Sequence, residues 1–158
     1  MTRLTHILLA LLVLIAAPTA SAEPDQTRLL GDWQSACDAW GTPATCRAVW
    51  QRGKHASLVE QHYTIVSAGN GAEIFAGRGL YRIIDGQVDG IWEDSRGQIL
   101  PLAGTYQDGV LSVIWGEASS EIGRSVYTLN KPTLQAVDSV LTDSGWRTFM
   151  TIDYSRIE

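Results

Sequence analysis

Apolar and polar residues alternate along most of the chain in short runs, and turn residues separate these runs. Residues 146–154 illustrate the pattern, with Phe149 as an exception to the alternation. The apolar face of this run holds Trp146, Met150, Ile152 and Tyr154. A period of two residues is that of a β-strand with one buried face. The pattern therefore predicts strands rather than helices over most of the chain.

Ten runs rich in Val, Ile, Thr, Tyr and Trp have the length of strands. They cover residues 32–38, 45–52, 57–67, 72–84, 87–93, 98–106, 110–115, 124–130, 133–141 and 146–157. Asp85-Gly86 and Asp108-Gly109 lie between such runs, and these dipeptides favour tight hairpin turns because Asp and Gly tolerate positive φ. Only residues 23–30 suggest a helical turn. We therefore predict one all-β domain over residues 23–158, an antiparallel meander that closes into a barrel of about 8–10 strands, with a sandwich as the alternative.

The first 22 residues have a different pattern, which is that of a cleavable signal peptide. Arg3 is followed by eleven residues without a polar side chain, Ile7 to Ala17, and then by the small residues Ala20-Ser21-Ala22. As a helix, at about 1.5 Å per residue, the apolar run would reach only about half of a ~30 Å hydrocarbon core. We predict cleavage after Ala22 and export. The absence of an Asn-X-Ser/Thr sequon favours a bacterial periplasm as the destination.

Removal of this segment makes the chain more acidic. It takes away one basic residue, Arg3, so the formal charge changes from −5 to −6. An acidic surface disfavours nucleic acid and anionic lipid as partners. We expect no integral membrane segment after cleavage. An eight-stranded outer-membrane barrel would fit the length, but charged residues interrupt both faces of residues 121–130 and 146–157.

The two cysteines, Cys37 and Cys46, flank a turn signal at Gly41-Thr42-Pro43. An even number of cysteines in an exported chain indicates a disulfide. The Cys-x-x-Cys spacing of a redox pair is absent from the sequence. We therefore predict a structural disulfide that joins the two arms of one hairpin.

A Gly-x-Trp motif follows the predicted helical turn, at Gly31-Asp32-Trp33. An exported β-meander with this opening resembles the lipocalin-like (calycin) barrels. The resemblance implies that Trp33 closes one end of the barrel and that a late basic residue packs across it. Arg156 is the best positional match for that residue, and Arg147 is the second choice.

Two predicted strands end in a tryptophan that is followed by acidic residues, at Trp92 and Trp115. Aromatic rings with a polar rim can form a ligand pocket, in which an arginine pairs with an acidic group. The candidate ligand-binding residues are Trp92, Trp115, Tyr106, Glu117, Glu121 and Arg124. The alternative is a solvated loop with local ion pairs, which contribute little to stability.

Catalytic and metal sites have less support in the sequence. Glycosidases use paired carboxylates, and Glu93, Asp94, Glu117 and Glu121 are the acids available for such a pair. A Gly-x-Ser-x-Gly elbow and a phosphate-binding glycine loop are both absent from the sequence. Glu60 and His62 share one face of a predicted strand, but a zinc site needs three or four ligands. We expect no catalytic residue, no metal and no cofactor.

These observations leave three hypotheses of function. The first is a non-catalytic envelope protein that binds a small apolar or amphipathic molecule in an aromatic-lined barrel. The second is an interaction module with a solid core, an inhibitor or assembly partner of another envelope protein, with contacts through residues 38–45 and 116–123. The third is a hydrolase that uses the carboxylates. The sequence leaves the oligomeric state open.

Overall fold

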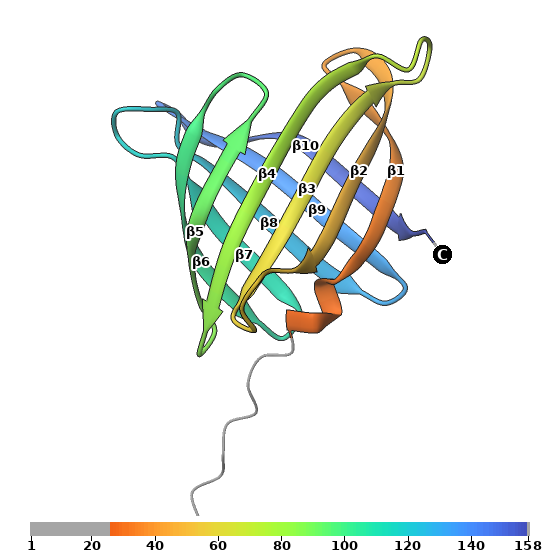
Figure 1. The fold of residues 1–158 in the computed structure, drawn as a ribbon. Coiled ribbons are helices and arrows are strands. Elements are labelled where there is room, and N and C mark those ends of the chain that lie inside the picture. The colour runs from red at the N-terminus through yellow and green to blue at the C-terminus, as the bar shows by residue number, and fades with distance from the viewer. Residues whose placement is uncertain (1–25, 158) are drawn as a thin grey trace, which may run out of the picture.

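The protein is a closed barrel of ten antiparallel strands in up-and-down order, as the computed structural model of residues 26–157 shows (Figure 1). A short 3-10 helix, η1 (Gln26–Leu29), precedes the strands. The strands are β1 (Gly31–Ala39), β2 (Thr42–Arg52), β3 (Leu58–Ser67), β4 (Glu73–Ile84), β5 (Gln87–Asp94), β6 (Ile99–Gln107), β7 (Val110–Trp115), β8 (Gly123–Asn130), β9 (Thr133–Thr142) and β10 (Gly145–Arg156). The predicted all-β class and the meander are confirmed. The predicted signal peptide lies outside the described residues.

Both predicted Asp-Gly turns form as tight hairpins. Asp85 and Gly86 have φ values of 49° and 76°, and Asp108 and Gly109 have values of 52° and 80°. Two successive residues with positive φ match the right-handed twist of the flanking strands. These turns join β4 to β5 and β6 to β7 at the end of the barrel where η1 lies (Figure 1).

The interior is formed by every second residue of each strand, and in β10 the phase changes at a bulge. A β-bulge lies between Thr148 and Met150. After the bulge, Met150 and the residues at every second position face the core, whereas Trp146 before it is 40% exposed. The prediction that Trp146 shares the inner face with Met150 is therefore wrong. The extra residue in the bulge also explains why Phe149 broke the alternation.

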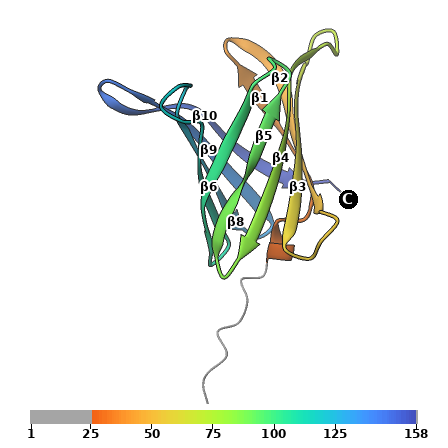
Figure 2. The ribbon, with the colours of Figure 1, turned by 60° about the vertical axis from the view of Figure 1, so that its left-hand side comes forward.

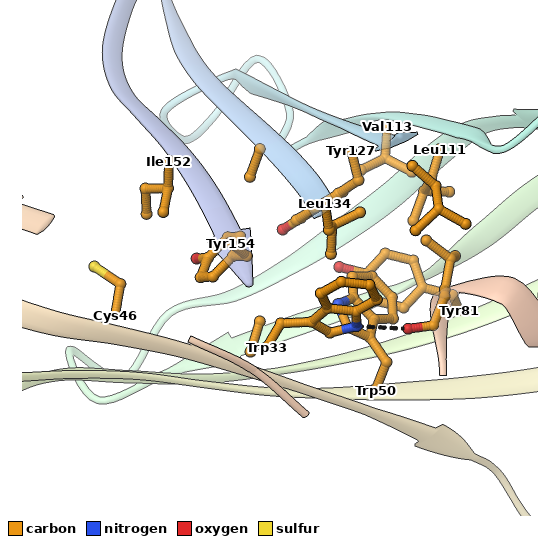
Figure 3. Close-up of a cluster of buried hydrophobic side chains, with 14 of the residues drawn as sticks. Trp33, Cys46, Trp50, Tyr81, Leu111, Val113, Tyr127, Leu134, Ile152 and Tyr154 are labelled. Carbon is orange, nitrogen blue, oxygen red and sulfur yellow. Dashed lines mark hydrogen bonds between the residues drawn. The ribbon is translucent and has the colours of Figure 1, made fainter. Parts of the chain in front are cut away.

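The end of the barrel near η1 is closed by packed side chains. Trp33 and Trp50 are almost fully buried there, and the indole Nε1 of Trp33 donates a hydrogen bond of 2.9 Å to the carbonyl oxygen of Leu29. The guanidinium of Arg156 lies 4.3 Å from the ring centroid of Trp33 and donates to the carbonyl oxygen of Leu30. This is the packing that the resemblance to lipocalin-like barrels implies. Figure 3 shows tryptophan, tyrosine and aliphatic side chains that point from different strands into this interior.

The opposite end is open and splayed. β1 and β10 close the barrel, but their register pairs only Trp33 with Arg156 and Gln34 with Ser155. Beyond these pairs the β9–β10 hairpin bends away from β1, as Figure 2 shows. The seam between the first and last strands is thus sealed near η1 and unpaired toward the other end.

The predicted disulfide is present. Cys37 and Cys46 lie on β1 and β2, with their Cα atoms 5.9 Å apart. Cys37 pairs in register with Ala44, and Cys46 with Ser35, so the bridge crosses the hairpin diagonally. It ties the part of β1 near the open end to β2, and this part of β1 has no pairing to β10.

Candidate ligand-binding site

A cavity of about 330 Å³ occupies the half of the barrel away from η1. Side chains from β3 to β10 and from the loops at the open end line it, and most of them are apolar or aromatic. Ligand pockets in proteins typically measure about 300–1,000 Å³ and have such linings with a few polar groups. The barrel is therefore filled in one half and hollow in the other.

Two tryptophans of the cavity wall lie over glycines of neighbouring strands. A Cβ atom added at Gly77 would come within 2.1 Å of the Trp92 ring, and one at Gly123 within 1.8 Å of the Trp115 ring. Both distances are far shorter than a contact between non-bonded atoms can be. The missing side chains give each indole a recess in the wall, and the rings leave the centre of the cavity open.

The floor of the cavity is a layer of polar aromatic side chains. Tyr81 Oη donates a hydrogen bond of 2.8 Å to Oε1 of Gln61, and Nε2 of Gln61 donates one of 3.1 Å to Tyr127 Oη. Trp50 lies against both tyrosine rings, with centroid distances of 5.2 and 5.1 Å. This layer separates the cavity from the packed core of the closed end.

The carboxyl group of Asp138 on β9 faces the deep part of the cavity. Ser125 Oγ on β8 donates a hydrogen bond of 2.5 Å to Oδ1 of Asp138. Trp115 Nε1 on β7 donates one of 3.2 Å to the same Ser125 oxygen. The three side chains come from consecutive strands and form a chain of hydrogen bonds that ends on the carboxylate.

Burial changes the acidity of the groups around the cavity. It raises the pKa of Asp138 from 3.8 to about 6, although the hydrogen bond from Ser125 acts in the opposite direction. Burial, and after it the Asp138 charge, also raises the pKa of Tyr63 and Tyr81 above the usual range. The tyrosines therefore stay neutral at ordinary pH, while Asp138 loses its proton near pH 6.

The mouth of the cavity combines exposed aromatic rings with charged groups. Trp40 is 61% exposed, Phe149 is 37% exposed, and both line the cavity. Arg96, Glu121 and Arg147 line it as well. Arg96 pairs with Asp94 at 3.0 Å, whereas Arg147 has no ion-pair partner within residues 26–157. The mouth therefore offers an apolar surface and a free guanidinium.

Half of the sequence-predicted ligand residues lie at the cavity. Trp92, Trp115 and Glu121 line it. Tyr106 does not, because it is buried in the core below the floor. Glu117 sits in the β7–β8 loop, where it accepts a hydrogen bond from Ser119 Oγ. Arg124 lies on the outer face, with its guanidinium 4.9 Å from the Trp146 ring centroid.

The other candidate acids have structural partners outside the cavity. Glu93 lies 3.6 Å from Arg78 in an ion pair on the outer surface. Asp94 accepts hydrogen bonds from the backbone nitrogen atoms of Arg96 and Gln98, and so shapes the β5–β6 turn. The structure does not bring these acids together as a catalytic pair.

The Glu60 and His62 side chains are on the outside of β3, 3.5 Å apart. Glu60 also accepts a hydrogen bond from Arg78, and the hydrogen bonds from Gln51 and Arg78 lower the pKa of the Glu60 carboxyl. In the part of the chain that the structure describes, no group of three or more potential metal ligands occurs. That part also contains no helix of the length and apolarity needed to cross a membrane.

Asp138 is a cavity residue that the sequence did not predict. The strand over residues 133–141 was predicted, and its inner face holds Leu134, Ala136 and Val140. Asp138 falls in the same phase, so an acidic residue on an otherwise apolar face was the signal available. Its partners Ser125 and Trp115 could not be assigned from the sequence, because they meet it only through the register of β7, β8 and β9.

Comparisons with known proteins reveal similarity of fold. No protein-family model matches the chain, and no curated protein matches it in sequence. Among solved structures, the crystal structure of Rv2717c from M. tuberculosis is similar with a TM-score of 0.66, over 84% of this chain and 94% of that one. The two sequences are 12% identical in the aligned part. This chain therefore shares its closed-barrel architecture with a solved protein of very different sequence.

Proposed function

We propose that the protein binds a small apolar or amphipathic molecule in the open half of its barrel and performs no chemistry on it. The observation that carries the proposal is the cavity of about 330 Å³ with its aromatic walls. A barrel evolved only as a solid scaffold gains stability by filling such a space, because empty volume forfeits packing contacts. The glycines under Trp92 and Trp115 keep the space open instead.

The form of the site also supports an amphipathic ligand. The deep part of the cavity has the carboxyl of Asp138, and the mouth has the unpaired guanidinium of Arg147 and the exposed rings of Trp40 and Phe149. An apolar body would occupy the space between these polar ends. Binding inside the barrel would make this chain similar to the lipocalin-like barrels in the use of its interior as well as in its fold.

A neutral fluorescent probe tests this function. We expect N-phenyl-1-naphthylamine, added to the purified protein with its disulfide intact, to bind saturably with a rise in fluorescence. Ala136→Phe adds a ring at the floor of the cavity and is expected to abolish the signal. Ala103→Phe adds the same ring on the exposed outer face of β6 and serves as the matched control.

The proposal fails if the probe does not bind, or if Ala136→Phe and Ala103→Phe bind it equally well. Circular dichroism of both variants checks that each retains the barrel. An interaction module with a solid core would give no probe signal with the unmodified protein.

We further propose that the protein is exported to a bacterial envelope after cleavage behind Ala22. The disulfide between Cys37 and Cys46 supports this, because such bonds persist in oxidising compartments. Mass spectrometry of the protein from a periplasmic fraction should identify Glu23 as the first residue. An intact N-terminus starting at Met1 in that fraction would contradict cleavage.

A further inference from the structure

Asp138 is an acid deep in the barrel without a basic partner. Within residues 26–157, no lysine, arginine or histidine nitrogen lies within ion-pair distance of its carboxylate. A buried charge of this kind is unfavourable unless it is paired or hydrogen-bonded. Asp138 has one hydrogen bond from a described side chain, the one to Oδ1 from Ser125.

The direction of the hydrogen bonds determines what the carboxyl can still accept. An indole N–H only donates, so Trp115 must donate to the Ser125 oxygen. The single hydroxyl proton of Ser125 then points to Asp138 Oδ1. Asp138 is thus held as an acceptor, and among the described residues nothing donates to its Oδ2. A ligand in the cavity could therefore donate a hydrogen bond to Oδ2 of Asp138.

The surroundings of this carboxyl suit a cation. The ring centroids of Tyr63 and Trp92 lie 6.4 Å apart in the cavity lining, and Trp115, which is bonded to Ser125, lines the cavity as well. The faces of tyrosine and tryptophan rings attract ammonium groups, and most strongly where water is excluded. A carboxylate among aromatic rings therefore combines two attractions for a positive charge.

We infer that the cavity selects small apolar molecules that carry an amino group, which binds as an ammonium ion at the Asp138 carboxylate. This inference rests on the proposed binding function and names the class of ligand. It disfavours simple fatty acids, because their carboxylate would meet a second negative charge if it entered first. An acidic group on the same ligand is compatible only at the mouth, beside Arg147.

A matched series of ligands tests the inference. The compounds are 2-(1-naphthyl)ethylamine, 2-(1-naphthyl)ethanol and 1-naphthylacetic acid, which share one ring system and differ in the polar group. Calorimetric titration at about pH 7.5 is expected to show the amine binding about tenfold or more tightly than the alcohol, because a charge-assisted hydrogen bond is roughly twice as strong as a neutral one. The acid is expected to bind most weakly.

Two variants locate the effect. Asp138→Asn retains the shape of the side chain and is expected to remove the preference for the amine while the alcohol still binds. Asp153→Asn removes a negative charge from the exposed outer face of β10, outside the cavity lining, and is expected to leave the preference unchanged. If the amine and the alcohol bind equally to the unmodified protein, or if Asp138→Asn retains the preference, the inference is wrong. If none of the three compounds binds and N-phenyl-1-naphthylamine does not bind either, the proposed function itself fails.

The preference should also depend on pH. Near pH 5 Asp138 is largely protonated, so the affinity for the amine is expected to fall to about the affinity for the alcohol. The tyrosines that approach Asp138 from other strands, Tyr63, Tyr81, Tyr127 and Tyr154, have raised pKa values and remain neutral. The charged groups at the mouth are Arg96, Glu121 and Arg147. An unchanged preference between pH 5 and 7.5 would contradict the assignment to Asp138.

Discussion

At the scale of single residues, Asp138 is the group whose position costs the protein stability. Its pKa is raised from 3.8 to about 6 because the ionised form is buried in the barrel. In the unfolded chain the same carboxyl ionises at its ordinary value. Between pH 3.8 and about pH 6 the Asp138 carboxyl is therefore protonated to a greater extent in the folded state than in the unfolded state. The contribution of Asp138 to the free energy of unfolding is therefore greatest below about pH 4 and is lost as the pH rises through about 6.

We predict that Asp138→Asn stabilises the ligand-free protein at neutral pH. The difference between 3.8 and about 6 corresponds to about 3 kcal/mol. Urea unfolding at a series of pH values should show the variant more stable than the original above pH 7 by up to this amount, and similar to it near pH 4. Parallel stability curves for the two proteins across this range would contradict the prediction.

At the same scale, the sequence indicated which side chains are aromatic or charged but not which of them meet. Trp92, Trp115 and Glu121 line the cavity, and all three lie near the ends of strands at the open side of the barrel. Arg124 lies on the outer surface instead, since the side chains of successive residues in β8 alternate between the cavity and the outer surface. Ser125, its neighbour, has the inner position.

At the scale of elements, the strands were predictable because their turns and periods are local features. The Asp-Gly hairpins and the alternation within each run need no information from the rest of the chain. The bulge in β10 could not be read in this way, because it depends on the pairing of β10 with β9. The recesses of Trp92 and Trp115 likewise exist only where a glycine of the adjacent strand lies beneath the ring.

We predict that Gly123→Ala narrows the cavity without unfolding the barrel. The added methyl group overlaps the Trp115 ring, so the indole must move inward and loosen its hydrogen bond to Ser125. The affinity for N-phenyl-1-naphthylamine should fall and the tryptophan emission should shift. Gly69→Ala is the control, since the nearest atom to its added Cβ is 3.8 Å away. Equal probe affinity in both variants would show that the recess does not matter.

The disulfide lies in the part of the β1–β2 hairpin that has no pairing to β10. After Gln34, β1 pairs with β2 but not with β10, so the Cys37–Cys46 bridge holds a strand segment that has one unpaired edge. Replacing both cysteines by alanine is expected to lower the free energy of unfolding by about 2–3 kcal/mol, as loop-closure entropy suggests for a ring of about ten residues. Hydrogen exchange should accelerate first at Ser35 to Ala39. Uniform acceleration over all strands would show that the bridge acts on the whole barrel.

At the scale of the whole molecule, the barrel divides into a packed half and a hollow half. Trp33, Trp50 and Leu134 fill the end near η1, and Arg156 covers it (Figure 3). The other end has the cavity, the unpaired seam and the exposed rings of the mouth. The fully buried side chains at the closed end stabilise the barrel, so the open end can remain unfilled. Stability and binding should therefore depend on different residues.

Two substitutions test this division. Leu134 is fully buried at the closed end, so Leu134→Ala is expected to lower the free energy of unfolding by about 2–5 kcal/mol, through lost contacts and a new void. The affinity for N-phenyl-1-naphthylamine should remain within about twofold, because sites without shared partners act almost independently. Phe149 is partly exposed at the mouth, so Phe149→Ser should change stability little and weaken binding. Denaturant unfolding gives the free energy of unfolding of each variant, and probe titration gives its affinity for N-phenyl-1-naphthylamine. If Leu134→Ala weakens binding as much as Phe149→Ser does, the two halves are coupled and the cavity is not an independent site.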